Sequence, residues 1–157
     1  MRASGARAAA IGTATAVPTI QRSALVEHAA GRMFALVDDI ESYPRRFDWC
    51  HGAQVLQRDA DRVLARLDLG VAGLRTWFTT ENRLSPPHHI DMQLRDGPFR
   101  RLDGRWTFHA LDESACKVSL HLEFEPQSRL LAPALLLGMQ TLADRMVDDF
   151  IRVADGR

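Results

Sequence analysis

The sequence has no excess of either charge and almost no lysine or tyrosine. Twenty Lys and Arg residues balance twenty Asp and Glu residues over 157 positions, and Lys117 and Tyr43 are the only residues of their kinds. Proteins that hold nucleic-acid phosphates by charge normally carry a basic excess. The balanced composition therefore argues against a DNA-binding protein.

Cysteine is also scarce. Cys50 and Cys116 lie far apart, and none of the six histidines completes an H-x-x-x-H pattern. We therefore expect no metal site and a reduced, cytoplasmic chain. Cys50, in a polar and aromatic stretch, is the better candidate for a reactive thiol, whereas alternation places Cys116 in the core.

Motifs for covalent or nucleotide chemistry are missing as well. The sequence contains no G-x-S-x-G, no Walker loop and no dinucleotide fingerprint, and its alternation places no acid–base pair on the apolar side of a strand. We expect a protein that is not an enzyme and needs no cofactor. The apolar run before Asp144 is shorter than the roughly 20 residues of a membrane span.

The longest periodic stretch lies at the end of the chain. Between Ser128 and Ala154, apolar residues recur at three- and four-residue steps and predict one long helix with a broad buried face. Ser128 is the expected N-cap, and Pro133 fits a first turn. The expected buried face comprises Leu131, Leu135, Met139, Leu142, Met146, Phe150 and Val153.

Short alternating segments fill most of the remaining chain. A first strand over residues 19–26 and a short helix over 29–38 precede six further strands, over 53–58, 62–69, 74–83, 88–95, 100–110 and 115–125. Turn signals every 8–12 residues favour a meandering antiparallel sheet. The pattern predicts an α+β fold in which a curved sheet wraps around the C-terminal helix and leaves an apolar pocket between them.

Residues 1–16 differ in composition from the remainder of the chain. They contain Arg2 and Arg7, no acidic residue and many small residues. We expect a disordered extension over residues 1–17, with one domain over residues 18–155. Val17, read from a GTG codon, is a candidate for the true start.

Four segments carry a resemblance to a known family. PTIQRSALV (18–26), MFALVDDIESYP (33–44), DGPFRRLDGRWTF (96–108) and ACKVSLHLEFE (115–125) closely resemble the START-like coenzyme-Q-binding proteins and RatA-type ribosome-association toxins. The resemblance covers nearly all of residues 18–154 and implies a helix-grip fold. The chain departs from the family pattern at Arg46 and Asp48, where members tend to carry an aromatic residue and a proline.

The resemblance implies three functions. The leading hypothesis is a carrier that shelters ubiquinone and supports respiration, with peripheral membrane contact as a further expectation. The second is a toxin that interferes with ribosomal subunit association through surface residues such as Arg75, Arg83 and Arg105. The third is an enzyme of the polyketide cyclase type, which requires a polar group inside the pocket.

For the carrier, twelve residues are the expected ligand contacts. Phe78, Met92, Leu94, Trp106 and Phe108 contribute from the sheet. Leu135, Met139, Leu142 and Met146 contribute from the helix. Tyr43, Phe47 and Trp49 are expected at the mouth of the pocket.

Overall fold

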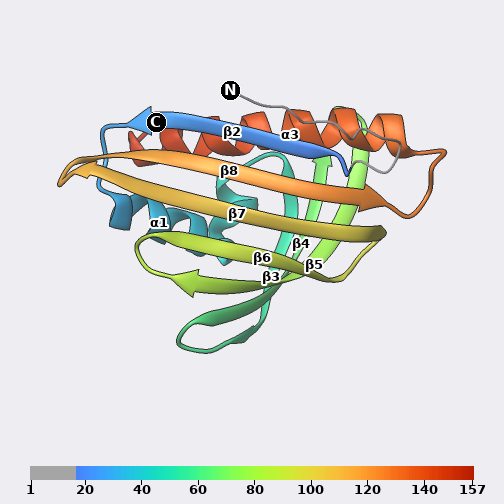
Figure 1. Ribbon diagram of the computed structural model, residues 1–157, viewed down its shortest axis with the longest axis horizontal. Coiled ribbons are helices and arrows are strands. Elements are labelled where there is room, and N and C mark those ends of the chain that lie inside the picture. Colours follow the sequence, from blue (N-terminus) through green and yellow to red (C-terminus); the bar gives the residue numbers. More distant parts are fainter. Residues whose placement is uncertain (1–16) are drawn as a thin grey trace, which may run out of the picture.

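The computed structural model describes residues 17–157, which form a seven-stranded antiparallel sheet curved around a long C-terminal helix (Figure 1). The strands are β2 (Thr19–Val26), β3 (Cys50–Arg58), β4 (Arg62–Val71), β5 (Leu74–Ser85), β6 (His89–Asp96), β7 (Phe99–Asp112) and β8 (Ala115–Pro126). The helices are α1 (Ala30–Asp38), the 3-10 turn η2 (Ile40–Ser42), α2 (Tyr43–Arg46) and α3 (Ala132–Ala154). The predicted disordered extension falls almost entirely outside the described residues.

The sheet is a meander of β3 to β8, and the first strand, β2, is added at the β8 edge. Its order is β2-β8-β7-β6-β5-β4-β3, and every neighbouring pair is antiparallel. The bending of the sheet is accompanied by irregular register at two places, between Val55 and Gln57 and between Thr79 and Thr80. The predicted α+β architecture is confirmed.

Alternation along the strands sorts the side chains onto two faces. In β8, the five residues of one parity are buried: Cys116, Val118, Leu120, Leu122 and Phe124. In β4, Val63, Ala65 and Leu69 are buried, whereas Arg62 and Arg66 are only partly covered. The concave face and α3 therefore enclose the core, as the pattern predicted.

The long helix begins later than predicted. α3 starts at Ala132, Pro133 occupies its first turn, and Ser128 does not cap it; the N-cap position is Leu131, which makes no side-chain capping bond. The backbone N–H of Ala132 instead bonds to the Arg129 carbonyl at 3.3 Å, so the preceding residues form a turn. Leu131 is therefore 62% exposed rather than buried.

The rest of α3 covers the sheet as expected. Leu135, Met139, Leu142, Met146 and Phe150 are buried. Among residues 17–157, no helix is long and apolar enough to span a bilayer.

Candidate functional site

An apolar cavity lies between the concave face of the sheet and α3. Its lining comprises Val37, Asp38, Ile40, Tyr43, Ala65, Leu67, Phe78, Thr80, Asn82, Ile90, Met92, Leu102, Gly104, Trp106, Leu120, Leu122, Met139, Leu142 and Met146. The space between these side chains, including its opening, measures about 730 Å³, but only about 50 Å³ of it has room for the centre of a water-sized sphere. The side chains therefore fill much of the cavity in this conformation.

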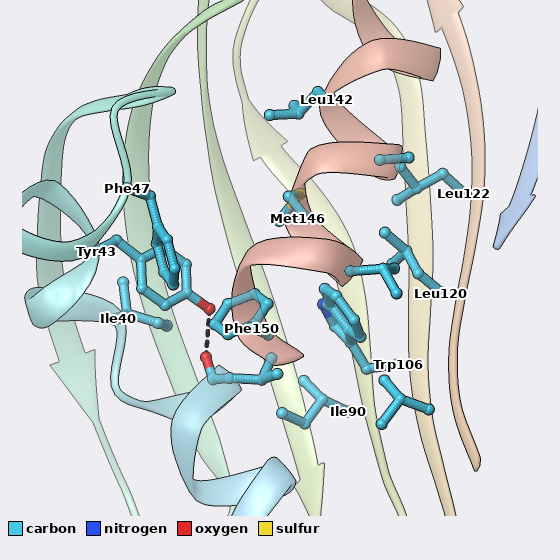
Figure 2. Packing of buried hydrophobic residues seen from close by; sticks show 14 of the residues in the cluster. Ile40, Tyr43, Phe47, Ile90, Trp106, Leu120, Leu122, Leu142, Met146 and Phe150 are labelled. Carbon is cyan, nitrogen blue, oxygen red and sulfur yellow. Dashed lines mark hydrogen bonds between the residues drawn. The ribbon is translucent and has the colours of Figure 1, made fainter. Parts of the chain in front are cut away.

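Helix and sheet meet across this cavity through long, flexible side chains. Leu142 and Met146 of α3 line the cavity together with Trp106, Leu120 and Leu122 of the sheet, and Figure 2 shows all five side chains beside the same stretch of the helix. Methionine has three rotatable bonds in its side chain and adapts to irregular space. The two methionines of α3 that line the cavity can therefore shift for a ligand at lower cost than branched residues could.

Two buried polar residues of β5 interrupt the apolar lining. Thr80 and Asn82 are 5% and 7% exposed, and the Thr80 hydroxyl donates to Asn82 Oδ1 at 2.7 Å. Within residues 17–157, the Asn82 amide nitrogen donates to no acceptor. The Asn82 amide is thus a hydrogen-bond donor in the lining that a ligand could use.

Neither Thr80 nor Asn82 is among the twelve residues predicted to contact a ligand. The signal was available, because Phe78, Thr80 and Asn82 share one parity of β5 and all line the cavity. A polar residue at an inward position of a strand is more informative than the apolar residues around it.

Seven of the twelve predicted contacts line the cavity. They are Tyr43, Phe78, Met92, Trp106, Met139, Leu142 and Met146. Phe47, Trp49, Leu94, Phe108 and Leu135 are not part of the lining. Whether the seven contact a ligand stays a prediction.

The three rings predicted at the mouth, Tyr43, Phe47 and Trp49, are buried in this structure. Tyr43 lines the cavity, whereas Phe47 and Trp49 do not. Phe47 and Trp49 are 2% and 0% exposed and stack with their centroids 4.8 Å apart. Both Tyr43 and Phe47 meet Phe150 of α3 edge to face, at 5.4 and 4.9 Å. The aromatic wall, Tyr43, Phe47, Trp49 and Phe150, packs α2 against α3.

Two hydrogen bonds hold this aromatic wall in place. The Trp49 indole N–H donates to Asp149 Oδ2 at 2.9 Å, and the Tyr43 hydroxyl donates to the Val37 carbonyl (Figure 2). Burial, followed by the charge of Asp38, raises the pKa of Tyr43 well above its usual value. Tyr43 is therefore a neutral donor at physiological pH.

The other predicted contacts have packing roles or lie to the side. Phe108 lies beyond Trp106, parallel to it at 6.3 Å, and meets Phe34 of α1 edge to face at 5.6 Å. Leu94 is only half-buried, opposite Thr80 and next to the irregular register of β5 and β6. Leu135 is buried near the beginning of α3 but outside the lining.

The two positions at which the chain departs from the family pattern, Arg46 and Asp48, place no charge in the cavity. Arg46 pairs with Asp39 at 3.3 Å, and Asp48 pairs with Arg145 of α3. Neither is part of the cavity lining. Both side chains instead form ion pairs outside the lining.

Neither cysteine is placed for reaction. Cys50 is 3% exposed, and burial raises the pKa of its thiol to about 11. Although Cys50 was the better candidate of the two for a reactive thiol, the stretch around it folds inward. Cys116 is fully buried in the core as predicted, and burial raises the pKa of its thiol as well.

The outer face of the sheet carries a network of ion pairs. Glu81 is 7% exposed and is surrounded by Arg62, Arg83 and Arg95. The bond from Arg95, supported by all three positive charges, lowers the pKa of Glu81. Arg105 pairs with Asp91 at 2.6 Å. Of the three arginines predicted to touch a ribosome, only Arg75 forms no ion pair with a described residue.

Comparison with known proteins identifies the relatives. The profile of the family described as polyketide cyclase / dehydrase and lipid transport matches residues 26–151. The ribosome association toxin RatA of Vibrio cholerae is 43% identical over 86% of this chain and 94% of its own length. The RatA of Escherichia coli K12 is 38% identical over 85% of each chain. The mitochondrial coenzyme Q-binding protein COQ10 of Drosophila melanogaster is 24% identical over 82% of this chain and 54% of its own.

Solved structures agree on the fold. A protein from Thermus thermophilus superposes with a TM-score of 0.77 at 18% identity, covering 86% of this chain and 95% of its own. The Zhui aromatase/cyclase from Streptomyces superposes with a TM-score of 0.76 at 17% identity, covering 89% and 94%. With the family profile and the RatA relatives, these likenesses show that the chain belongs to the START-like polyketide cyclase / dehydrase and lipid transport family, among the relatives of RatA.

Proposed function

We propose that this protein is a non-enzymatic binding protein for an apolar ligand held between the sheet and α3, and that the ligand is a quinone with an isoprenoid tail. The observation that carries the proposal is the cavity itself, with an apolar lining and one free amide donor at Asn82. The distant likeness to a coenzyme Q-binding protein supports the same ligand class.

The chemistry of the lining fits the two parts of such a ligand. A quinone ring has carbonyl oxygens that accept hydrogen bonds and no strong donor, and the Asn82 amide supplies a donor. Its isoprenoid tail gains about 25 cal/mol for each Å² removed from water, and Met139, Leu142 and Met146 supply the apolar surface. A ligand without any acceptor would leave the amide unsatisfied.

Binding requires the cavity to widen. Ligand sites for molecules of this size usually enclose about 300–1,000 Å³, much more than the room now free between the side chains. α3 makes few close contacts with β4 and β5, so we expect the beginning of α3 and the β4–β5 turn to separate when a ligand enters.

The ionisable groups of the cavity support a role without catalysis. Tyr43 and Asp38 are the titratable residues of the lining. The Tyr43 hydroxyl is committed to the Val37 carbonyl, and Asp38 accepts a bond from Arg58 at 3.1 Å. Neither is paired with a second group in the arrangement that general acid–base catalysis needs.

A quinone titration tests the proposal. Short-tailed ubiquinone added to the full chain should quench the part of the tryptophan fluorescence that comes from Trp106, which lines the cavity. Leu142→Glu should abolish this quenching because it puts a carboxylate into an apolar cavity. Leu137→Glu, on the exposed side of the same helix, is the matched control and should bind normally. A folded Leu142→Glu protein that binds like the parent would contradict the proposal.

A second candidate function is interference with ribosomal subunit association. It is favoured by the relatives named RatA, which are 38–43% identical over at least 85% of both chains. Overexpression followed by a sucrose-gradient profile tests it. A growing fraction of free subunits, reduced by Arg75→Glu, would support this function, and an unchanged profile would count against it.

A further inference from the structure

An exposed apolar surface marks one end of the molecule. Leu130, Leu131 and Leu137, at the beginning of α3, are 90%, 62% and 61% exposed. Leu130, Ala134 and Leu137 follow one another at helical spacing, whereas Asp144 and Asp148 continue the same side of the helix further along. This outward side is thus apolar only in its first two turns.

The turn between β4 and β5 extends the same surface. Ala72 and Gly73 of this turn are exposed and uncharged, and Leu74 packs so closely on Gly138 that an added Cβ would overlap the leucine Cδ2. Figure 1 shows the end of β4 and the beginning of β5 beside the first half of α3. We call Leu130, Leu131, Leu137 and the turn residues Ala72 and Gly73 the apolar tip.

Two arginines that form no ion pair with a described residue adjoin the apolar tip in the sequence. Arg129 precedes the leucines and Arg75 follows the turn, and neither forms an ion pair with any residue between 17 and 157. The chain also enters the described structure at this end, since the Pro18 carbonyl accepts the Phe124 N–H at 3.1 Å near the end of β8. The 16 residues before Val17 carry Arg2 and Arg7 and no acidic residue.

We infer that the apolar tip docks this protein on the surface of a membrane that contains anionic lipids. Exposed leucines in a group are unusual on a protein surface that faces only water, and they gain free energy by entering the acyl boundary. Arginines at the rim reach the headgroup phosphates while their stems stay in the apolar layer. The inference stands apart from the quinone proposal, because it rests on surface residues outside the cavity.

Vesicle sedimentation tests this inference with the full chain. We expect the protein to pellet with phosphatidylcholine vesicles containing about one-third phosphatidylglycerol, less with pure phosphatidylcholine, and less at high salt. The variant Leu130→Gln/Leu131→Gln/Leu137→Gln should lose at least about ten-fold in binding. Arg75→Gln/Arg129→Gln should lose the preference for anionic vesicles.

A matched variant controls for the loss of surface leucines in general. Leu25, Leu56 and Leu111 are 73%, 47% and 53% exposed but lie away from the apolar tip, so their triple change to Gln should leave vesicle binding intact. Equal behaviour of the two triple variants, or no pelleting of the parent protein, would overturn the inference. A third outcome would also overturn it: the parent protein is a dimer in solution and the apolar-tip variant is a monomer. A second copy of the chain, and not a membrane, would then cover the leucines.

Discussion

Thr80 and Asn82 bond to each other inside the cavity, with the Thr80 hydroxyl donating to the Asn82 amide oxygen at 2.7 Å. The bond satisfies the oxygen of the amide, whereas the amide nitrogen donates to no acceptor among residues 17–157. Polar groups this deeply buried normally have partners. The pair is therefore the feature of the cavity that most directly indicates what kind of ligand it accepts.

Asn82→Leu should weaken quinone binding about ten-fold, because one neutral hydrogen bond contributes about 0.5–1.5 kcal/mol. The change should also destabilise the free protein by about 1–3 kcal/mol, since the Thr80 hydroxyl loses its acceptor. Titration and urea unfolding measure the two effects.

The double variant Thr80→Val/Asn82→Leu separates these effects. It removes both polar groups, so it should recover most of the lost stability without recovering the affinity. If the double variant binds quinone as well as the parent, Asn82 does not contact the head group.

Gly138→Ala should destabilise the protein even though alanine favours helices by about 1 kcal/mol over glycine. An added Cβ would overlap Cδ2 of Leu74 and lie 3.0 Å from its Cβ, so rotation of the leucine alone cannot relieve the clash. In a Leu74→Ala background the same change should cost less, because the overlap with Cδ2 is gone and only the 3.0 Å contact with Cβ remains. Urea unfolding of the parent, the two single variants and the double variant gives the coupling between the two changes in the free energy of unfolding. Additive changes would contradict the close approach of the β4–β5 turn to α3.

Both cysteines should resist thiol reagents in the folded protein. With a pKa of about 11, Cys50 is ionised in only about one molecule in a thousand at pH 8, and its side chain is buried. Titration with a coloured disulfide reagent should detect about two thiols only after denaturant is added. Rapid reaction of the native protein, lost in Cys50→Ser, would show that the Cys50 segment opens.

Glu81 should contribute stability that depends on pH. Its pKa is lowered by the bond from Arg95, so the contribution is fully present above the ordinary glutamate value of about 4.3 and is lost as the pH falls through the lower folded value. Glu81→Gln should therefore lower the melting temperature at pH 7 and have a smaller effect at pH 3. An equal drop in melting temperature at pH 7 and pH 3 would mean that the ion pairs of Glu81 contribute no stability. Arg101→Gln, in another ion-pair group on the same face, is a control for general surface charge.

The fold was predictable because alternation and turns are local signals. The parity of β4, β5 and β8 and the face of α3 from Leu135 onward can be read directly from the sequence. The start of α3 was missed because Ser128 has the chemistry of a cap, but the turn before Pro133 delays the helix.

The candidate site was harder to predict than the fold. Phe47 and Trp49 were expected at a mouth, yet the Phe47 ring packs on Phe150 and the Trp49 indole bonds to Asp149, each about a hundred positions away. A contact of that separation has no periodic signal in the sequence. Asn82 was missed because strand polar residues were expected on the outer face, although its parity placed it inside.

The central claim is that the cavity between the sheet and α3 holds a quinone. The most direct measurement is organic extraction of the full chain purified from its native host, followed by mass spectrometry of the extract. We expect a prenylated quinone close to one per protein, lost in Leu142→Glu and retained in Leu137→Glu. An extract without quinone from the parent protein, or equal quinone in both variants, would contradict the claim.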